Sequence, residues 1–287
     1  TTSEPDETFF VNIVSATGAN VSDAQGLGTI LNDDVNVVAI HDIQGNGLLS
    51  PLNGGVVVTE GIVTALKFNN GFFLQAPDAE ADADPNTSEG IFVFTSTAPP
   101  AAAAVGNRVR VTATVSEFTP TTNLNQLSIT ELVTPTVVSL SSGNPLPTPV
   151  VLTSADFGPA STPGTAEKLE GMRVTMASGR VVAPTDGNIT ESSANASTTG
   201  VFHAVLDGVA RPFREPGLDV LDLFPVPGGK TPPRFDHNAE RIMVRSRGQI
   251  GATSLTPEVD AQIANMTGVL DYFSGTWALL PDAGSGT

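Results

Sequence analysis

The chain has 287 residues and a formal net charge of −17; 40% of its residues are hydrophobic, 15% are charged, and it has 28 glycines, 22 prolines and no cysteine. This composition excludes a disordered or coiled-coil chain and indicates turn-rich β structure around more than one hydrophobic core. It also excludes disulfides, thiolate metal sites and cysteine nucleophiles, and no apolar run approaches the roughly 20 residues of a membrane-spanning helix.

Short alternating segments dominate the chain. Each is rich in β-branched or aromatic residues and is bounded by turn residues, which is the pattern of half-buried strands. Helical spacing occurs only in 166–172 and 256–265. We therefore predict an all-β fold with strands in 8–14, 56–66, 71–75, 90–94, 108–118, 126–130, 172–182 and 200–206.

Two stretches predict domain boundaries. Residues 31–36 form a polar turn, and residues 143–165 are rich in Pro, Ser, Thr and Gly, as in an extended linker or a long crossing segment. We therefore divide the chain into four parts: 1–35, a module 36–142, a linker 143–165, and a second β unit 166–287.

Two hairpin-like segments resemble each other. Residues 60–78 and 267–283 both run from Gly through an apolar strand, a turn with Gly and an aromatic strand to Pro-Asp. The echo pairs Phe73 with Trp277, and it predicts a second β-barrel-like unit built on the same hairpin.

The acidic charge is concentrated toward the N-terminus. Residues 1–166 hold 16 acidic residues but only three basic ones, Lys67, Arg108 and Arg110. Because a negative surface repels polyphosphate, this part predicts a poor nucleic-acid surface unless cations intervene. The remainder is richer in arginine and is the better candidate to contact nucleic acid, although the charge argument favours solvated surface charge around an aromatic core.

An acidic loop between two predicted strands has the spacing of a calcium loop. Its oxygen-bearing residues occupy positions one, three, five, seven, nine and twelve, as in an EF-hand. The sixth position is Ala83 instead of Gly and the eighth is Pro85, so the likeness concerns spacing only. A solvated hairpin loop is the alternative. The candidate Ca²⁺ ligands are Asp78, Glu80, Asp82, Asp84, Asn86 and Glu89.

The chain has three histidines, His41, His203 and His237. A general base or a metal site needs partners that converge on it, and the local sequence supplies no second histidine or nucleophile at a useful spacing. We expect structural roles for all three and predict no catalytic residue.

Residues 4–34 resemble the last strands of a Calx-β domain. The resemblance rests on "EPDETFFV", on "GA" before a strand, and on the closing "GTILNDD". It implies partial Calx-β sandwich strands in 1–35 and calcium ligands at one end of them. By position the implied ligands are Glu4, Asp6, Glu7, Asp33 and Asp34.

Residues 37–135 resemble the OB-fold-like module of large secreted bacterial nucleases of the endonuclease/exonuclease/phosphatase superfamily. The carrying segments are "VVAIHDIQGNGLLSPLNGGVVVTEGIVTAL", "GFFLQAPD…TSEGIFVFT" and "VGNRVRVTATVSEF…NQLSIT", and three later segments, "KLEGMRVTM", "RFDHNAERIMV" and "MTGVLDYFSGTWALLPD", look like the region that precedes the nuclease domain in those proteins. The resemblance implies a catalytic domain after residue 287, so we carry over no catalytic residue.

These observations predict a non-catalytic, calcium-stabilised accessory region of a secreted bacterial nuclease or phosphoesterase, which positions substrate or neighbouring domains. The alternative is a structural or adhesive extracellular β module, in which the N-terminal strands pair with a second copy. Both readings imply an extracellular or cell-surface location without a membrane span.

Overall fold

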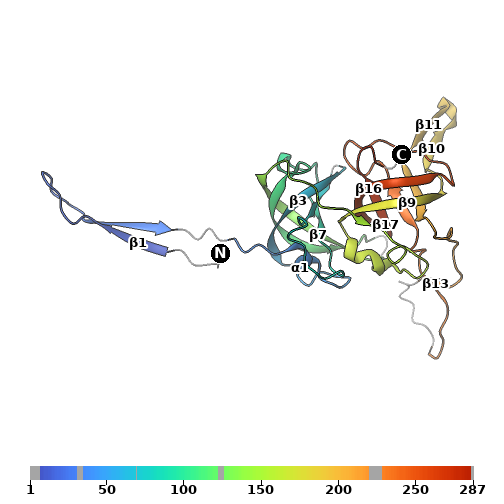
Figure 1. Cartoon of the computed structure of the whole chain (residues 1–287), viewed down its shortest axis with the longest axis horizontal. Coiled ribbons are helices and arrows are strands. Elements are labelled where there is room, and N and C mark those ends of the chain that lie inside the picture. The colour runs from blue at the N-terminus through green and yellow to red at the C-terminus, as the bar shows by residue number, and fades with distance from the viewer. Residues whose placement is uncertain (1–6, 31–34, 69, 122–125, 220–227, 286–287) are drawn as a thin grey trace. The chain divides into compact units, whose positions relative to one another are not determined.

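The computed structural model describes residues 7–30, 35–68, 70–121, 126–219 and 228–285. It divides the chain into two compact units, 1–37 and 38–287 (Figure 1). The first unit contains one antiparallel hairpin, β1 (Glu7–Asn12) and β2 (Gln25–Ile30), and every residue of β1 is exposed. No helix in the described ranges is long and apolar enough to cross a membrane.

The second unit begins with a closed five-stranded barrel. Its strand order is β3-β4-β5-β7-β6, and all pairings are antiparallel except the parallel one between β5 and β7. Helix α1 (Ile40–Gln44) packs Ile40 and Ile43 into the barrel core, and a short 3₁₀ turn, η1 (Ala101–Ala103), precedes β6. The strands are β3 (Val56–Lys67), β4 (Gly71–Gln75), β5 (Gly90–Phe94), β6 (Arg108–Phe118) and β7 (Ile129–Ser141).

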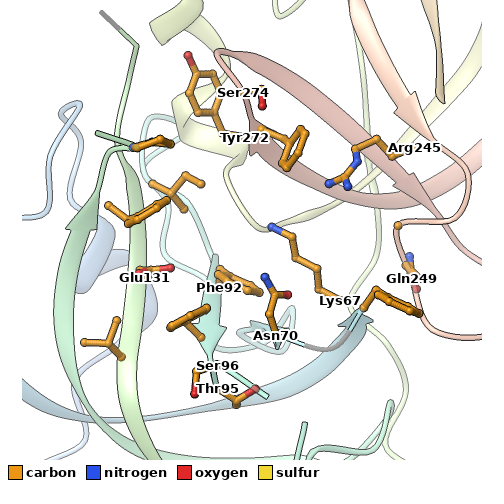
Figure 2. A pocket seen from close by; sticks show the side chains of 18 of the residues that line it. Lys67, Asn70, Phe92, Thr95, Ser96, Glu131, Arg245, Gln249, Tyr272 and Ser274 are labelled. Atoms are coloured by element: carbon orange, nitrogen blue, oxygen red, sulfur yellow. The ribbon is translucent and has the colours of Figure 1, made fainter. Parts of the chain in front are cut away.

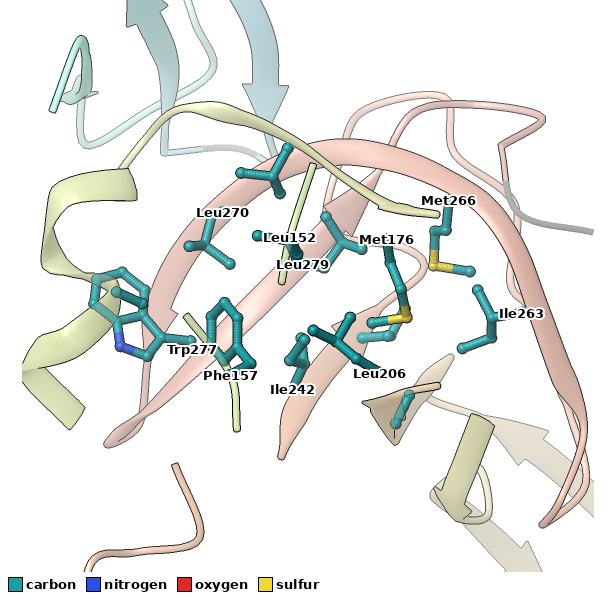
Figure 3. Close-up of a cluster of buried hydrophobic side chains, with 14 of the residues drawn as sticks. Leu152, Phe157, Met176, Leu206, Ile242, Ile263, Met266, Leu270, Trp277 and Leu279 are labelled. Carbon is teal, nitrogen blue, oxygen red and sulfur yellow. The ribbon is translucent and has the colours of Figure 1, made fainter. Parts of the chain in front are cut away.

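A second ring of strands has the same connectivity. β9 pairs with β12 and β16, β12 pairs with β15, β17 pairs with β16, and β15 pairs with β17 in parallel. The pairing of β12 with β9 closes the ring. Its core packs Phe157, Met176, Leu270 and Trp277 (Figure 3). Phe202 is buried in the same core. The strands are β9 (Arg173–Ala183), β12 (Val201–Leu206), β15 (Ile242–Arg245), β16 (Gln262–Phe273) and β17 (Thr276–Pro281).

Several short elements are attached to this second ring. A two-residue strand, β8 (Val150–Val151), lies parallel to β9. The hairpin of β10 and β11 is inserted between β9 and β12, and β13 and β14 form a small parallel pair. These elements are η2 (Pro163–Leu169), β10 (Gly187–Thr190), η3 (Glu191–Ser193), β11 (Asn195–Thr198), β13 (Leu218–Asp219) and β14 (Arg234–Phe235).

Numbered in chain order, strands one to five are β3, β4, β5, β6 and β7 in the first ring and β9, β12, β15, β16 and β17 in the second. In both rings strand one pairs with strands two and four, and strand four pairs with strand five. Strand three pairs with strand two and, in parallel, with strand five. The predicted all-β fold with an OB-fold-like barrel and a second barrel-like unit is therefore confirmed. The two echoing segments, however, occupy different places in this order. Residues 60–78 form strands one and two of the first barrel, whereas 267–283 form strands four and five of the second. The two segments are therefore similar as hairpins, but they are not equivalent strands of the two barrels.

The two barrels are packed against each other. Ala65, Phe73 and Phe92 of the first form one buried cluster with Val269, Ala278 and Leu280 of the second. The backbones also meet, because Ile250 N donates to Leu66 O at 2.9 Å. Residues 143–165 cross from one barrel to the other, and Leu152 and Phe157 from this segment are buried in the second core.

Candidate functional site

A cavity of about 760 Å³ lies between the two barrels (Figure 2). Its volume is within the roughly 300–1,000 Å³ of ordinary small-molecule sites. Three parts of the first barrel line the cavity. They are the turn between β3 and β4, strand β5 with the residues after it, and the end of β6 with the loop that follows and β7. These elements include strand three and the two loops through which OB-folds bind oligonucleotides and oligosaccharides.

The second barrel lines the same cavity with equivalent elements. Thr199 precedes strand two, Arg247 and Gln249 follow strand three, and Phe273 ends strand four. Phe118 ends strand four of the first barrel and lines the cavity too. The corresponding loops of two barrels therefore enclose one space.

Aromatic rings form much of the wall. Phe92 and Phe94 lie two residues apart on β5, so both point to the outer side of the barrel, and their ring centroids are 6.5 Å apart. From the second barrel Tyr272 and Phe273 line the cavity, and Tyr272 Oη accepts a hydrogen bond from Leu127 N. Phe92 and Tyr272 are nearly fully buried, so Phe94 and Phe273 are the rings that could stack on a flat ligand.

Three cationic side chains reach the cavity. Lys67 Nζ lies 2.8 Å from Asp271 Oδ2 and 4.5 Å from the centre of the Phe92 ring. The guanidinium of Arg245 lies 3.8 Å from the centre of the Phe273 ring, and Arg247 is exposed at the cavity with no carboxylate partner among the described residues. The cavity is thus a basic spot in an acidic protein.

Hydrogen-bond acceptors without donors also face the cavity. Glu131 on β7 is buried, and no described residue donates a hydrogen bond to it; burial raises its pKa to about 7, although the charge of Lys67 opposes the rise. Asn70 Oδ1 and Gln126 Oε1 are buried and have no hydrogen-bond partner in the described part of the chain. A bound ligand would satisfy these groups if it carried N–H or O–H donors.

The six predicted ligands of the acidic loop do not converge on one point. Asp78 accepts hydrogen bonds from Thr148 N and Oγ1 at 2.9 and 2.6 Å. Glu80 pairs with Arg108, at 2.6 Å from Nη1. Asp84 is occupied within the loop, where its Oδ1 accepts from the backbone and side-chain nitrogens of Asn86.

Asp82 and Glu89 do come together, and they are joined by His41. One ligand atom from each of the three lies within 4.8 Å of the others. His41 Nδ1 is 3.0 Å from Glu89 Oε1, which also accepts from Asp82 N at 2.7 Å. Burial acts to lower the pKa of His41, but the hydrogen bond and charge of Glu89 outweigh it and raise that pKa. The arrangement offers one nitrogen and two carboxylates, fewer oxygens than Ca²⁺ ordinarily takes from a loop.

The ligands implied by the Calx-β resemblance are mostly outside the described residues. Glu4, Asp6, Asp33 and Asp34 fall there, and Glu7 is exposed at the start of β1. The other two histidines lie apart from the cavity. His203 pairs through β12 with β9 and β15, and burial lowers its pKa, as does the charge of Arg241. His237 stacks on Phe235 at 5.3 Å.

A group of buried carboxylates lies where η2 meets the first barrel. Glu117 accepts from Ser50 N at 2.6 Å and from Thr130 Oγ1 at 2.9 Å, whereas Glu170 Oε1 and Glu167 Oε2 have no hydrogen-bond partner among the residues that the structure describes. Burial first, and then the charge of Glu117, raises the pKa of Glu167 to about 8; burial and the neighbouring glutamates raise that of Glu170. Glu167 therefore favours its protonated form at neutral pH.

Comparisons of the chain with protein-family models, with curated proteins and with solved structures found no match. No local sequence pattern predicts the cavity, because its residues come from many distant segments. The one local signal was aromatic: Phe92 and Phe94 face the same side of a strand whose intervening residue, Val93, is buried in the barrel core.

Proposed function

We propose that this chain is a non-catalytic binding region that positions a strand of nucleic acid for a secreted bacterial nuclease or phosphoesterase. The observation that carries the proposal is the cavity between the barrels, where aromatic walls and unpaired cationic charge occur together. Single-stranded nucleic acid is bound by other OB-folds through stacked bases and basic side chains.

The distribution of charge supports this site over the rest of the surface. Arg108 and Arg110 of the first barrel are both paired with Glu60, at 3.1 and 2.8 Å, and are therefore neutralised. Arg247 has no carboxylate partner among the described residues, whereas Arg245 stacks on the Phe273 ring and lies 4.0 Å from Asp271 Oδ2. An acidic exterior around a basic cavity favours a strand end or a single nucleotide over a long duplex.

We also propose a calcium site at the acidic loop, with fewer ligands than the spacing in the sequence predicts. Asp82 and Glu89, with His41, are the described residues that could hold a cation at the acidic loop. A cation there would tie the loop to α1, because His41 belongs to that helix. Calcium at the proposed Calx-β strands remains a prediction from resemblance.

A structural or adhesive module is the second candidate, and the first unit favours it. Phe10 and Leu27 are 58% and 63% exposed on the β1–β2 hairpin. An isolated two-stranded hairpin is marginally stable in water, so pairing with a further strand would stabilise it.

Fluorescence anisotropy with a labelled eight-nucleotide single strand tests the proposal. We expect binding at low salt, and we expect Arg247→Glu to weaken it and to reduce the slope of log K against log salt by about 1. Arg180→Glu is the matched control, because it makes the same charge change away from the cavity, in an exposed pair with Asp260. Absent binding at low salt, or equal effects of the two variants, would contradict the proposal.

A further inference from the structure

The acceptors inside the cavity limit what the ligand can be. Glu131 is only 6% exposed and receives no hydrogen bond from a described residue, and the carboxamide oxygens of Asn70 and Gln126 are buried without donors. An unsatisfied buried acceptor is costly, so the preferred ligand brings donors. Carboxamides can rotate to present either an acceptor or a donor, whereas an ionised carboxylate only accepts. Glu131 is therefore the residue that requires the ligand to carry hydrogen-bond donors.

Burial raises the pKa of Glu131 to about 7 and the charge of Lys67 opposes that rise, so a ligand that donates hydrogen bonds to the carboxylate would favour its ionised form. Lys67 interacts with it electrostatically, and the two side chains approach the same space from β7 and from the end of β3 (Figure 2). Ionised carboxylates pair best with two parallel N–H donors, as they do with a guanidinium. The ligand group that faces Glu131 should accordingly offer two adjacent donors.

Among the four DNA bases, guanine alone has that feature. Its ring N1–H and its exocyclic amino group are adjacent donors on one edge. Adenine and cytosine place one donor beside an acceptor, and thymine has one donor between two carbonyls. A site whose buried polar group is left unpaired by the wrong ligand discriminates strongly.

The other walls fit the rest of a guanine nucleotide. Phe94 offers a ring face on the side of the first barrel, and Arg245 and Arg247 lie on the side of the second, where a phosphate could bind. A sugar with vicinal hydroxyls would also satisfy Glu131, but it would leave Arg247 without an anion, whereas Arg245 already lies 4.0 Å from Asp271 Oδ2.

We infer that the cavity is selective for guanine nucleotides, with Glu131 as the specificity-determining residue that accepts the two donors of the base. This inference rests on the proposed function and adds the identity of the preferred base. Asn70 and Gln126 bind the remaining edge of the base or the ribose.

Isothermal titration of the whole chain with GMP, IMP and AMP tests the inference. IMP differs from GMP only in lacking the exocyclic amino group. We expect GMP to bind about tenfold more tightly than IMP or more, and AMP to bind no better than IMP. In Glu131→Gln, which keeps the shape of the side chain, the ratio between GMP and IMP should fall toward one.

The outcomes separate the inference from the proposed function. Equal affinities for the three nucleotides would overturn guanine selectivity and leave nucleotide binding standing. An unchanged ratio in Glu131→Gln, in a variant that melts like the wild type, would remove Glu131 from the role. If no nucleotide binds, or if glucose binds in their place, both the inference and the proposed function fail. The nucleotide series uses the wild-type chain, so it decides the question even if the variant does not fold.

Discussion

Lys67 and Asp271 form a buried ion pair that joins the two barrels, with Lys67 Nζ 2.8 Å from Asp271 Oδ2. Lys67 ends β3 of the first barrel and Asp271 lies on β16 of the second. The pair holds the ammonium group over the Phe92 ring at the cavity. This pair therefore adds an ionic contact to the apolar cluster between the barrels and places a charge in the proposed site.

Removing one partner of this pair should destabilise the second unit. In Lys67→Met the carboxylate of Asp271, only 1% exposed, loses its closest cation, and the free energy of unfolding should fall by about 3–5 kcal/mol. Arg180→Met is the control, because the exposed Arg180–Asp260 pair should contribute less than about 1 kcal/mol. Urea unfolding measures both, and similar losses in the two variants would contradict the assignment.

The close approach of Gly90 and Gly171 should be intolerant of a side chain. A Cβ at Gly90 would lie 2.3 Å from the carbonyl carbon of Gly171, which is backbone and cannot rotate away. We expect Gly90→Ala to lower stability by about 1–3 kcal/mol or more by pushing η2 and β9 from the first barrel. Gly47→Ala, where a Cβ has no neighbour nearer than 3.9 Å, should be nearly neutral in the same thermal melts. Equal melting temperatures of Gly90→Ala and Gly47→Ala would contradict this prediction, because they would mean that the backbone at Gly171 moves aside at little cost.

Stability should fall as the pH rises because of the buried glutamates. The pKa of Glu167 is about 8 in the folded chain against 4.5 ordinarily, so the folded state holds a proton that the unfolded state releases. This contribution is fully present below about pH 4.5 and is lost as the pH rises through about 8, with a total on the order of a few kcal/mol. Glu167→Gln should flatten the decline in unfolding free energy between pH 5 and 8.5. A decline that is unchanged in the variant would mean that other groups titrate.

Calcium should stabilise the acidic loop through Asp82 and Glu89. We expect added CaCl₂ to raise the melting temperature of the wild type, and to do so less in Asp82→Ala and in Glu89→Ala, because ligand binding to the folded state alone shifts unfolding. Asp260→Ala removes an exposed carboxylate outside the loop and should leave the shift intact. If all four proteins respond alike, the loop carries only solvated charge.

The barrels were predictable from the sequence because burial alternates along their strands. In β6, Val109, Val111, Ala113 and Val115 are buried and the residues between them are not, which is the period that the sequence shows. The segment 256–265 was misread as a helix. Its end belongs to β16, which begins at Gln262 and pairs with Arg180 of β9, so long-range pairing overrides a short local preference.

The candidate site was less predictable than the fold. Calcium-like spacing in the acidic loop did not gather its ligands, because Glu80 and Asp78 find Arg108 and Thr148 in other segments. The cavity depends on how two barrels dock, and no local pattern contains that information. Arg247 looks in the sequence like any surface arginine.

Filling the cavity tests the central claim most directly. Ala252 lines the cavity and is half-buried, so Ala252→Trp would place an indole in the space proposed for the base. The affinity for the labelled single strand should fall by about tenfold or more while the melting temperature stays near that of the wild type, since the stacking of one base contributes about 1–3 kcal/mol. Unchanged affinity in a folded variant with the cavity filled would contradict the account.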